Sequence, residues 1–98
     1  MVEKNKSKRV ANSGGHPMVA KGTATTQATV PFVFQGQSVL STSVYIANTG
    51  STNALNVFID GTVNSITIPT GEYRYFNMEV SEIDVQSTTT TYEIIYTF

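Results

Sequence analysis

The sequence predicts an all-β protein, a small antiparallel β-sandwich of about seven strands. Two observations predict it. Val, Ile and Thr make up 33 of the 98 residues, whereas Leu occurs only at positions 40 and 55. β-branched residues lose side-chain freedom in helices and pack well on pleated sheets. From Ala28 onward, turn signals also recur at intervals of about 8–12 residues, which is the spacing of short antiparallel strands.

Alternation of apolar and polar side chains places the individual strands. Leu55, Val57 and Ile59 alternate with polar or outward-facing neighbours, as expected of a strand with one buried face. Asp60-Gly61 predicts a hairpin turn, because both residues tolerate positive φ, and Pro69-Thr70-Gly71 predicts a second turn. The expected strands cover residues 30–34, 38–47, 55–60, 63–68, 72–78, 82–86 and 92–98.

The first part of the chain differs in composition from the rest. Residues 1–9 carry four cations and one anion, a net charge of +3, whereas residues 10–98 carry two cations and six anions, a net charge of −4. Residues 1–27 are small and polar, with a breaker at Gly14-Gly15-His16-Pro17. Such a segment buries too little apolar surface to offset the entropy of ordering it. We therefore expect a basic and polar N-terminal arm over 1–27 and the sandwich over 28–98.

A body of this length predicts association with other chains. A core built from so few residues supplies only about 3–5 kcal/mol without disulfides or a metal, and the sequence has no cysteine. The aromatic strand 92–98 would also leave an open sheet edge, which proteins cover or charge. We expect a homo-oligomer, for example a trimer, or a subunit seated on a larger assembly.

The sequence offers little for catalysis, and we predict a non-enzymatic protein without a cofactor or metal. The lone His16 lies in the breaker segment, where nothing would hold it against a serine. Glu79, Glu82 and Asp84 could run glycoside hydrolysis only in a cleft, and a solvated strand face explains them better. A small hydrolase using these carboxylates stays a minor alternative.

Two groups of residues are candidates for binding. The five tyrosines are Tyr45, Tyr73, Tyr75, Tyr92 and Tyr96, and we expect them in the core or at a subunit interface, Tyr73, Tyr75, Tyr92 and Tyr96 being the interface candidates. A carbohydrate-binding module that uses these rings is the alternative. Nucleic acid is not expected, because a stacking platform needs a basic groove.

The basic residues of the arm are the second group, and we expect them either to contact an acidic surface of a partner protein or to keep the chain in solution. They are Lys4, Lys6, Lys8 and Arg9. No membrane anchor is expected, because no Trp, Phe or Leu stands beside them and no stretch is long enough to cross a bilayer. The basic start is followed by small polar residues, so export by a signal peptide is not expected either.

Part of the sequence resembles small β-sandwich virion proteins of tailed bacteriophages. The similarity spans residues 44–86 and lies in a strand that ends in Asn48-Thr49-Gly50, a strand that closes on Asp60-Gly61, the turn Ile68-Pro69-Thr70-Gly71-Glu72, and the strand Ile83-Asp84-Val85. The resemblance implies a structural role in the virion, assembled in the host cytoplasm: a capsid decoration or cement protein, or else a head–tail, tail or fibre accessory protein. It implies other capsid or tail subunits as partners and brings no catalytic residues.

Overall fold

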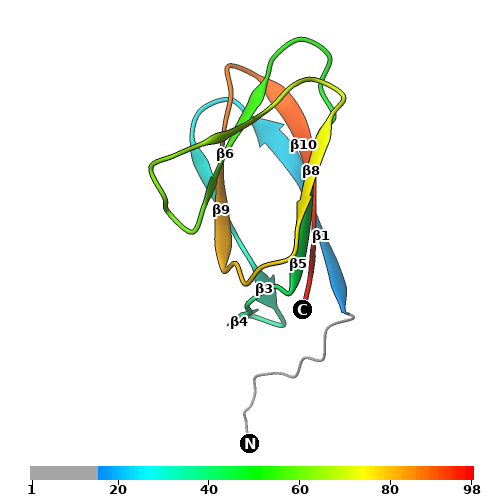
Figure 1. Ribbon diagram of the computed structural model, residues 1–98, viewed down its shortest axis with the longest axis vertical. Helices are drawn as coiled ribbons and strands as arrows, with labels where there is room; N and C mark the ends of the chain where they lie inside the picture. The colour runs from blue at the N-terminus through cyan, green and yellow to red at the C-terminus, as the bar shows by residue number, and fades with distance from the viewer. Residues whose placement is uncertain (1–15) are drawn as a thin grey trace, which may run out of the picture.

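The computed structural model describes residues 16–98, which fold as an all-β sandwich with no helix in that range (Figure 1). This confirms the fold class that the sequence predicts. The strands are β1 (Pro17–Ala24), β2 (Ala28–Pro31), β3 (Val33–Phe34), β4 (Gln37–Ser38), β5 (Ser43–Asn48), β6 (Leu55–Ile59), β7 (Ile66–Ile68), β8 (Tyr73–Phe76), β9 (Glu82–Gln86) and β10 (Thr90–Thr97).

Eight of these strands build two antiparallel sheets that face each other (Figure 1). Sheet A has the order β1-β10-β5-β8 and sheet B the order β2-β9-β6-β7, while β3 and β4 form a small separate hairpin. Among the eight, the first strand pairs with the last, the second with the seventh, the third with the sixth and the fourth with the fifth. This nested pairing across two sheets is a jelly roll.

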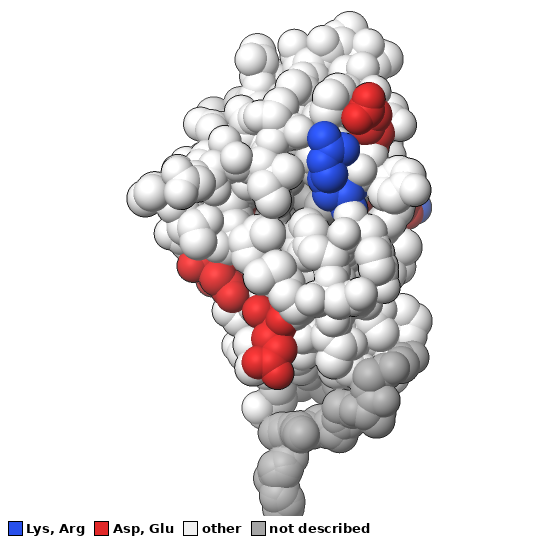
Figure 2. Space-filling view, viewed as in Figure 1, with Lys and Arg blue, Asp and Glu red and all other residues white. Residues whose placement is uncertain are grey.

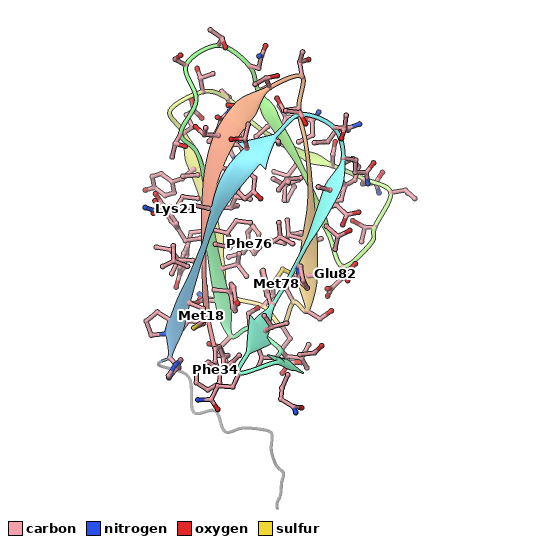
Figure 3. The ribbon with its side chains drawn as sticks, turned by 180° about the vertical axis from the view of Figure 1, so that it is seen from behind. Met18, Lys21, Phe34, Phe76, Met78 and Glu82 are labelled. Atoms are coloured by element: carbon pink, nitrogen blue, oxygen red, sulfur yellow. The ribbon has the colours of Figure 1, made fainter. Side chains whose placement is uncertain are left out.

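The core lies between the two sheets and follows the predicted alternation. Val44 and Ile46 of β5 and Val57 of β6 are fully buried, while their neighbours along each strand are more exposed. Tyr96 stacks on Phe32 with ring centroids 4.1 Å apart. Figure 3 shows Phe76 pointing into the space between the sheets and Lys21 pointing away from it.

The predicted turns are present with the expected backbone. Asp60 and Gly61 have φ values of 50° and 72°, and the Thr62 N–H donates to the Ile59 carbonyl at 3.0 Å. Gly71 has a φ of 75°, and the Glu72 N–H donates to the Pro69 carbonyl at 3.2 Å. The first turn joins β6 to β7 and the second joins β7 to β8, so local turn chemistry supports the topology of the jelly roll.

The expected strand 38–47 is divided in the structure. Its interruption is at Ser41, whose hydroxyl donates to the Met78 carbonyl at 2.8 Å and accepts from the Val80 N–H at 3.0 Å. The Ser41 N–H also donates to the Val80 carbonyl at 3.0 Å. These bonds to a segment far along the chain take the place of a continuous ladder, which alternation along one strand does not reveal.

The expected boundary between arm and sandwich, at residues 27 and 28, is wrong. Pro17–Ala24 form β1, which pairs along its whole length with β10. Its inward positions hold small residues as well as Met18, so the apolar alternation is faint in the sequence. Gly22 is needed at one of them, because a Cβ atom there would lie 2.6 Å from the Tyr92 hydroxyl. Residues 1–15 of the expected arm lie outside the described residues.

The same strand corrects the expected open edge at 92–98. β10 is an inner strand, with β1 on one side and β5 on the other. The wrong arm boundary and the wrong sheet edge have one cause, because residues 17–24, which lie within the expected arm, form the strand that pairs with β10. The edges of sheet A are β1 and β8 instead.

Asn48, at the end of β5, ties that strand to the 49–54 loop, to β7 and to β10 at one end of the sandwich. Its buried side chain donates from Nδ2 to the carbonyls of Asn53 at 2.9 Å and Ile68 at 3.0 Å. Its Oδ1 accepts from the Gly50 N–H at 3.0 Å and from the Thr90 hydroxyl at 2.7 Å. The amide therefore uses both donors and accepts two bonds, which satisfies a polar group that burial would otherwise penalise.

The first prediction tests the corrected boundary. A chain that begins at Gly15 should keep a cooperative thermal transition within about 5 °C of the full chain, because every described strand is retained. A chain that begins at Ala28 should lose it, since β10 would become an open edge and its partners in the core would be exposed. Circular dichroism melts of both chains measure this, and equal melting temperatures would place β1 outside the folding unit.

The second prediction concerns the buried amide. Asn48→Ala should lower the free energy of unfolding by about 3 kcal/mol, because it leaves two carbonyls, one N–H and one hydroxyl without their partner. Asn64→Ala, in an exposed loop, should change it by less than about 0.5 kcal/mol. Urea unfolding of both variants is the measurement. A small effect of Asn48→Ala would show that water replaces the amide at little cost.

Candidate functional site

The outer face of sheet A carries a row of apolar and aromatic side chains across all four strands. Strand register places Val19, Ile95, Tyr45 and Tyr75 side by side, from β1 through β10 and β5 to β8. Val19 is 56% exposed and Tyr75 58% exposed. This row is the centre of what we call the sheet A face.

The remaining rows of the sheet A face surround that centre. The adjacent row is formed by Lys21, Glu93, Ala47 and Tyr73. Lys21 and Glu93 are 3.5 Å apart, and Tyr73 is 59% exposed. The outermost rows are rich in hydroxyl groups, and their members are Pro17, Thr97 and Ser43 on one side and Thr23, Thr91 and Thr49 on the other. An apolar centre with a polar rim is the usual composition of a protein interface.

The four candidate interface tyrosines divide between the two sides of the sheet. Tyr73 and Tyr75 lie on the outer face, where the Tyr73 ring is 5.3 Å from that of Tyr45. Tyr96 is buried, and its hydroxyl donates to the Val33 carbonyl at 2.8 Å and accepts from the Val33 N–H at 3.2 Å. Tyr92 packs against the core beside Gly22. Tyr92 and Tyr96 are therefore corrected to core residues, because their positions on β10 point inward.

The basic residues Lys4, Lys6, Lys8 and Arg9 lie outside the described residues, so their role as a partner-binding group stays a prediction. Sequence reasoning missed Val19 and Ile95, which belong to the centre of the sheet A face. Val19 is an apolar residue between Met18 and Ala20. It can be assigned to the outer face only once 17–24 is known to be a strand, because successive residues of a strand face opposite sides.

The three carboxylates considered for hydrolysis do not gather in a cleft of the described part of the chain. Asp84 accepts from the Thr29 hydroxyl at 2.7 Å and from the Gln27 side chain at 3.0 Å, so its oxygens hold β2 and the preceding loop against β9. Glu82 is on the same outer side of β9, near the margin of the molecule in Figure 3, and Glu79 is exposed in the loop before it. This arrangement is the solvated face that alternation predicts.

Asp60 has a structural use for its carboxylate. Its Oδ1 accepts from the Ser81 N–H at 2.9 Å, the Ser81 hydroxyl at 2.9 Å and the Glu82 N–H at 3.1 Å. Burial alone would raise the pKa of Asp60, but these hydrogen bonds from Ser81 and Glu82 outweigh it and lower the pKa below the usual 3.8. The hairpin turn is thereby fastened to the start of β9.

His16 is held by the fold, contrary to the expectation of an unsupported histidine. Its N–H and carbonyl exchange hydrogen bonds with Phe98, both at 3.1 Å. Its ring packs edge-on against Phe34 at 4.5 Å and lies 5.1 Å from the Phe98 ring. The described residues around it are aromatic, so the imidazole has packing partners and no acid–base partner there.

A shallow hollow of about 500 Å³ lies beside β6 and the end of β9. It is lined by Thr25, Thr26, Gln27, Asn56, Gln86, Ser87 and Thr88. Its lining contains hydroxyl and amide groups but no His, Asp, Glu or Lys to move a proton, so it has hydrogen-bonding capacity only.

Over residues 16–98 no three His, Asp or Glu side chains come close enough together to hold a metal ion. No helix in that same range is long and apolar enough to cross a membrane.

Comparison with known proteins gives one distant structural match to report. No family model matches the chain, and no curated protein matches it. A chain from a study of Bacillus endospore appendages, which are described as a novel family of disulfide-linked pili, is 19% identical. The match covers 97% of this chain and 99% of that chain, with a TM-score of 0.42.

The third prediction uses the lowered pKa of Asp60. A group with a lowered pKa stabilises the fold above its unfolded-state value of about 3.9, and this stability is lost as pH falls through the folded-state pKa. Asp60→Asn keeps the turn residue and one acceptor oxygen but removes the charge. The wild type should be more stable than Asp60→Asn by up to about 1 kcal/mol above pH ~5, because solvent screens this exposed group.

That stability difference should shrink as the pH is lowered below about 4. Urea unfolding at a series of pH values measures it, and all other carboxyl groups cancel because both proteins contain them. A difference that stays constant from about pH 7 to about pH 3 would mean that the charge of Asp60 does not matter for folding.

Proposed function

We propose that this chain is a non-enzymatic structural subunit of a multi-copy particle, and more finely a capsid decoration protein of a tailed phage. The sheet A face carries this proposal. It presents an exposed apolar and aromatic centre, with Val19, Tyr73 and Tyr75 each more than half exposed, on a rigid four-stranded scaffold. An exposed patch of this kind with a polar rim marks a site of protein association.

The use of polar groups supports a structural role. Several polar side chains form hydrogen bonds that join turns and strands, and these are Asn48, Ser41, Asp60 and Asp84. The hollow beside β9 has no titratable lining residue. Residues 16–98 thus present a surface for protein contact, and their polar side chains described above serve to hold the fold together.

The phage assignment is supported by two further considerations of different kinds. Jelly rolls are common among viral capsid proteins, although the fold also serves lectins and cupins, so this is an analogy at the level of the fold. The motifs that resemble phage virion proteins, Asn48-Thr49-Gly50 and Pro69-Thr70-Gly71-Glu72, meet in one place. The Asn48 N–H donates to the Glu72 carbonyl, and the Gly71 N–H donates to the Asn48 carbonyl, both at 2.9 Å.

The basic residues Lys4, Lys6, Lys8 and Arg9 complete the proposal as the group that contacts an acidic surface of a neighbouring virion subunit. Their four positive charges give a salt-sensitive attraction, because exposed charges are screened beyond about 10 Å at 0.1 M salt. The described body, with two cations and six anions, has the opposite sign and would not compete for that surface.

The fourth prediction tests the particle role. Mass spectrometry of density-gradient-purified particles from the source that encodes the chain should find it in fixed proportion to the major capsid protein. A combined Lys4→Ser, Lys6→Ser, Lys8→Ser and Arg9→Ser variant of the full chain should bind particles more weakly, by about tenfold or more at low salt and by less at high salt.

Two results would contradict the proposal in different ways. Absence of the chain from purified particles would remove the phage role. Equal binding of the two proteins at every salt concentration would remove only the role of the basic residues. A specific signal on a glycan array that Tyr73→Ala or Tyr75→Ala abolishes would favour the carbohydrate-binding alternative, because these two rings are exposed side by side on β8.

A further inference from the structure

We infer that the sheet A face is the place where two copies of this chain pack against each other, face to face about a twofold axis. This deepens the proposed function and rests on it, since it names a second copy as the partner of that surface. A twofold contact uses the same patch on both subunits, so the patch must be complementary to itself.

The apolar content of the sheet A face meets the first requirement. Its central row of Val19, Ile95, Tyr45 and Tyr75 crosses the sheet without a charged side chain. The two middle members lie on the inner strands β10 and β5, and the two outer members are more than half exposed. Burial of this row against the same row of another copy would remove apolar surface from water on both sides.

Charge is the second requirement, and it favours a copy of this chain over a strongly charged partner. The rows of the sheet A face contain one cation and one anion, Lys21 and Glu93, which already pair at 3.5 Å. The face is therefore electrically neutral, although the described body as a whole carries more anions than cations. Neither a basic nor an acidic partner would find a complementary field there.

Four of the five other acidic side chains in residues 16–98 are located where they would not meet across such a contact, and the fifth, Glu72 in the turn before β8, is paired with Arg74 at 3.5 Å. Asp60, Glu82 and Asp84 belong to the β6–β7 turn and to β9, on the side of sheet B, and Glu79 lies in the loop before β9. Figure 2 shows acidic side chains gathered on the flank where β9 and that loop lie in Figure 1. Two copies can approach through sheet A without bringing these like charges together.

Shape is the third requirement. Sheets of equal twist pack with their strands about 30° apart and their backbones about 10 Å apart, and two copies of one sheet have equal twist by construction. Four strands about 4.8 Å apart and the four rows of the face give a projected area on the order of 400 Å². Stable interfaces bury about 800 Å² per partner, so we expect a weak, concentration-dependent dimer.

The fifth prediction is tested by sedimentation of the full chain over a range of concentrations. The wild type should dimerise reversibly below about 1 mM. Val19→Lys should weaken the dimer at least about tenfold, because it places an ammonium group in the apolar row, where association would desolvate it. Val63→Lys is the matched control. It makes the same change at a valine that is 90% exposed in the loop before β7, away from this face, and it should leave dimerisation unchanged.

A second measurement does not depend on stability. The sequence has no cysteine, so one introduced thiol reports on one position. Ile95→Cys lies near the centre of the face, and a short bis-maleimide that spans about 10 Å should join two copies there. Val63→Cys should remain uncrosslinked at the same concentration. Thermal melts of each variant at concentrations below the dimerisation range show whether the monomer is still folded.

The outcomes separate this inference from the proposed function. A monomeric wild type at about 1 mM together with uncrosslinked Ile95→Cys would overturn pairing of two copies. Equal effects of Val19→Lys and Val63→Lys would overturn it too. Suppose that dimerisation fails either of these tests but that the Val19→Lys variant no longer binds to purified particles. The particle role would then stand, and a different subunit would cover the sheet A face. If the chain were absent from particles while dimerisation behaved as expected, the proposed function would fail and the dimer would remain.

Discussion

The end of the sandwich that contains the 49–54 loop depends on one buried amide. Asn48 has no charge, yet its side chain reaches the 49–54 loop, the end of β7 and the start of β10, and its backbone bonds to the turn that precedes β8. Each of these segments is short and would be marginal alone. Gly50 completes the arrangement, because a Cβ atom there would lie 1.9 Å from the Thr90 hydroxyl oxygen. A small jelly roll without disulfides thus gains order from a satisfied polar cluster.

The first and last strands of residues 16–98 are joined in the same sheet, and this explains how so small a domain closes. β1 and β10 pair over eight residues each, and His16 exchanges two hydrogen bonds with Phe98. The pairing with β1 makes β10 an inner strand and moves the edge of the sheet to a strand whose inward side chains, apart from Met18, are small. The core is consequently larger than a count from residue 28 suggests, because residues of β1 pack in it. The feature that favours association is therefore the exposed apolar face of sheet A and not a small core.

The two sheets differ in the side chains that they present to solvent. Sheet B and its loops carry most of the carboxylates, and Asp60 and Asp84 there use their oxygens to hold neighbouring segments. Sheet A presents its neutral apolar row outward, with the two middle residues on strands paired on both sides and the two outer residues on edge strands paired on one side. A rigid, uncharged surface of this kind suits repeated contact in an assembly, since little conformational entropy is lost when it is covered.

The sequence by itself determined the fold class, the turn at Asp60-Gly61 and the inward set on β6, because alternation and turn chemistry are local properties. It also predicted tyrosines in the core or at an interface, and Tyr92 and Tyr96 do pack in the core. Only the tertiary structure decided that 17–24 is a strand, that Tyr92 and Tyr96 face inward while Tyr73 and Tyr75 face outward, and that Val19 and Ile95 stand in one row with Tyr45. These facts depend on which strands pair and in which register. That pairing joins residues far apart in the chain. The reason for a small inward residue such as Gly22 is visible only in the structure, where the Tyr92 ring packs against it.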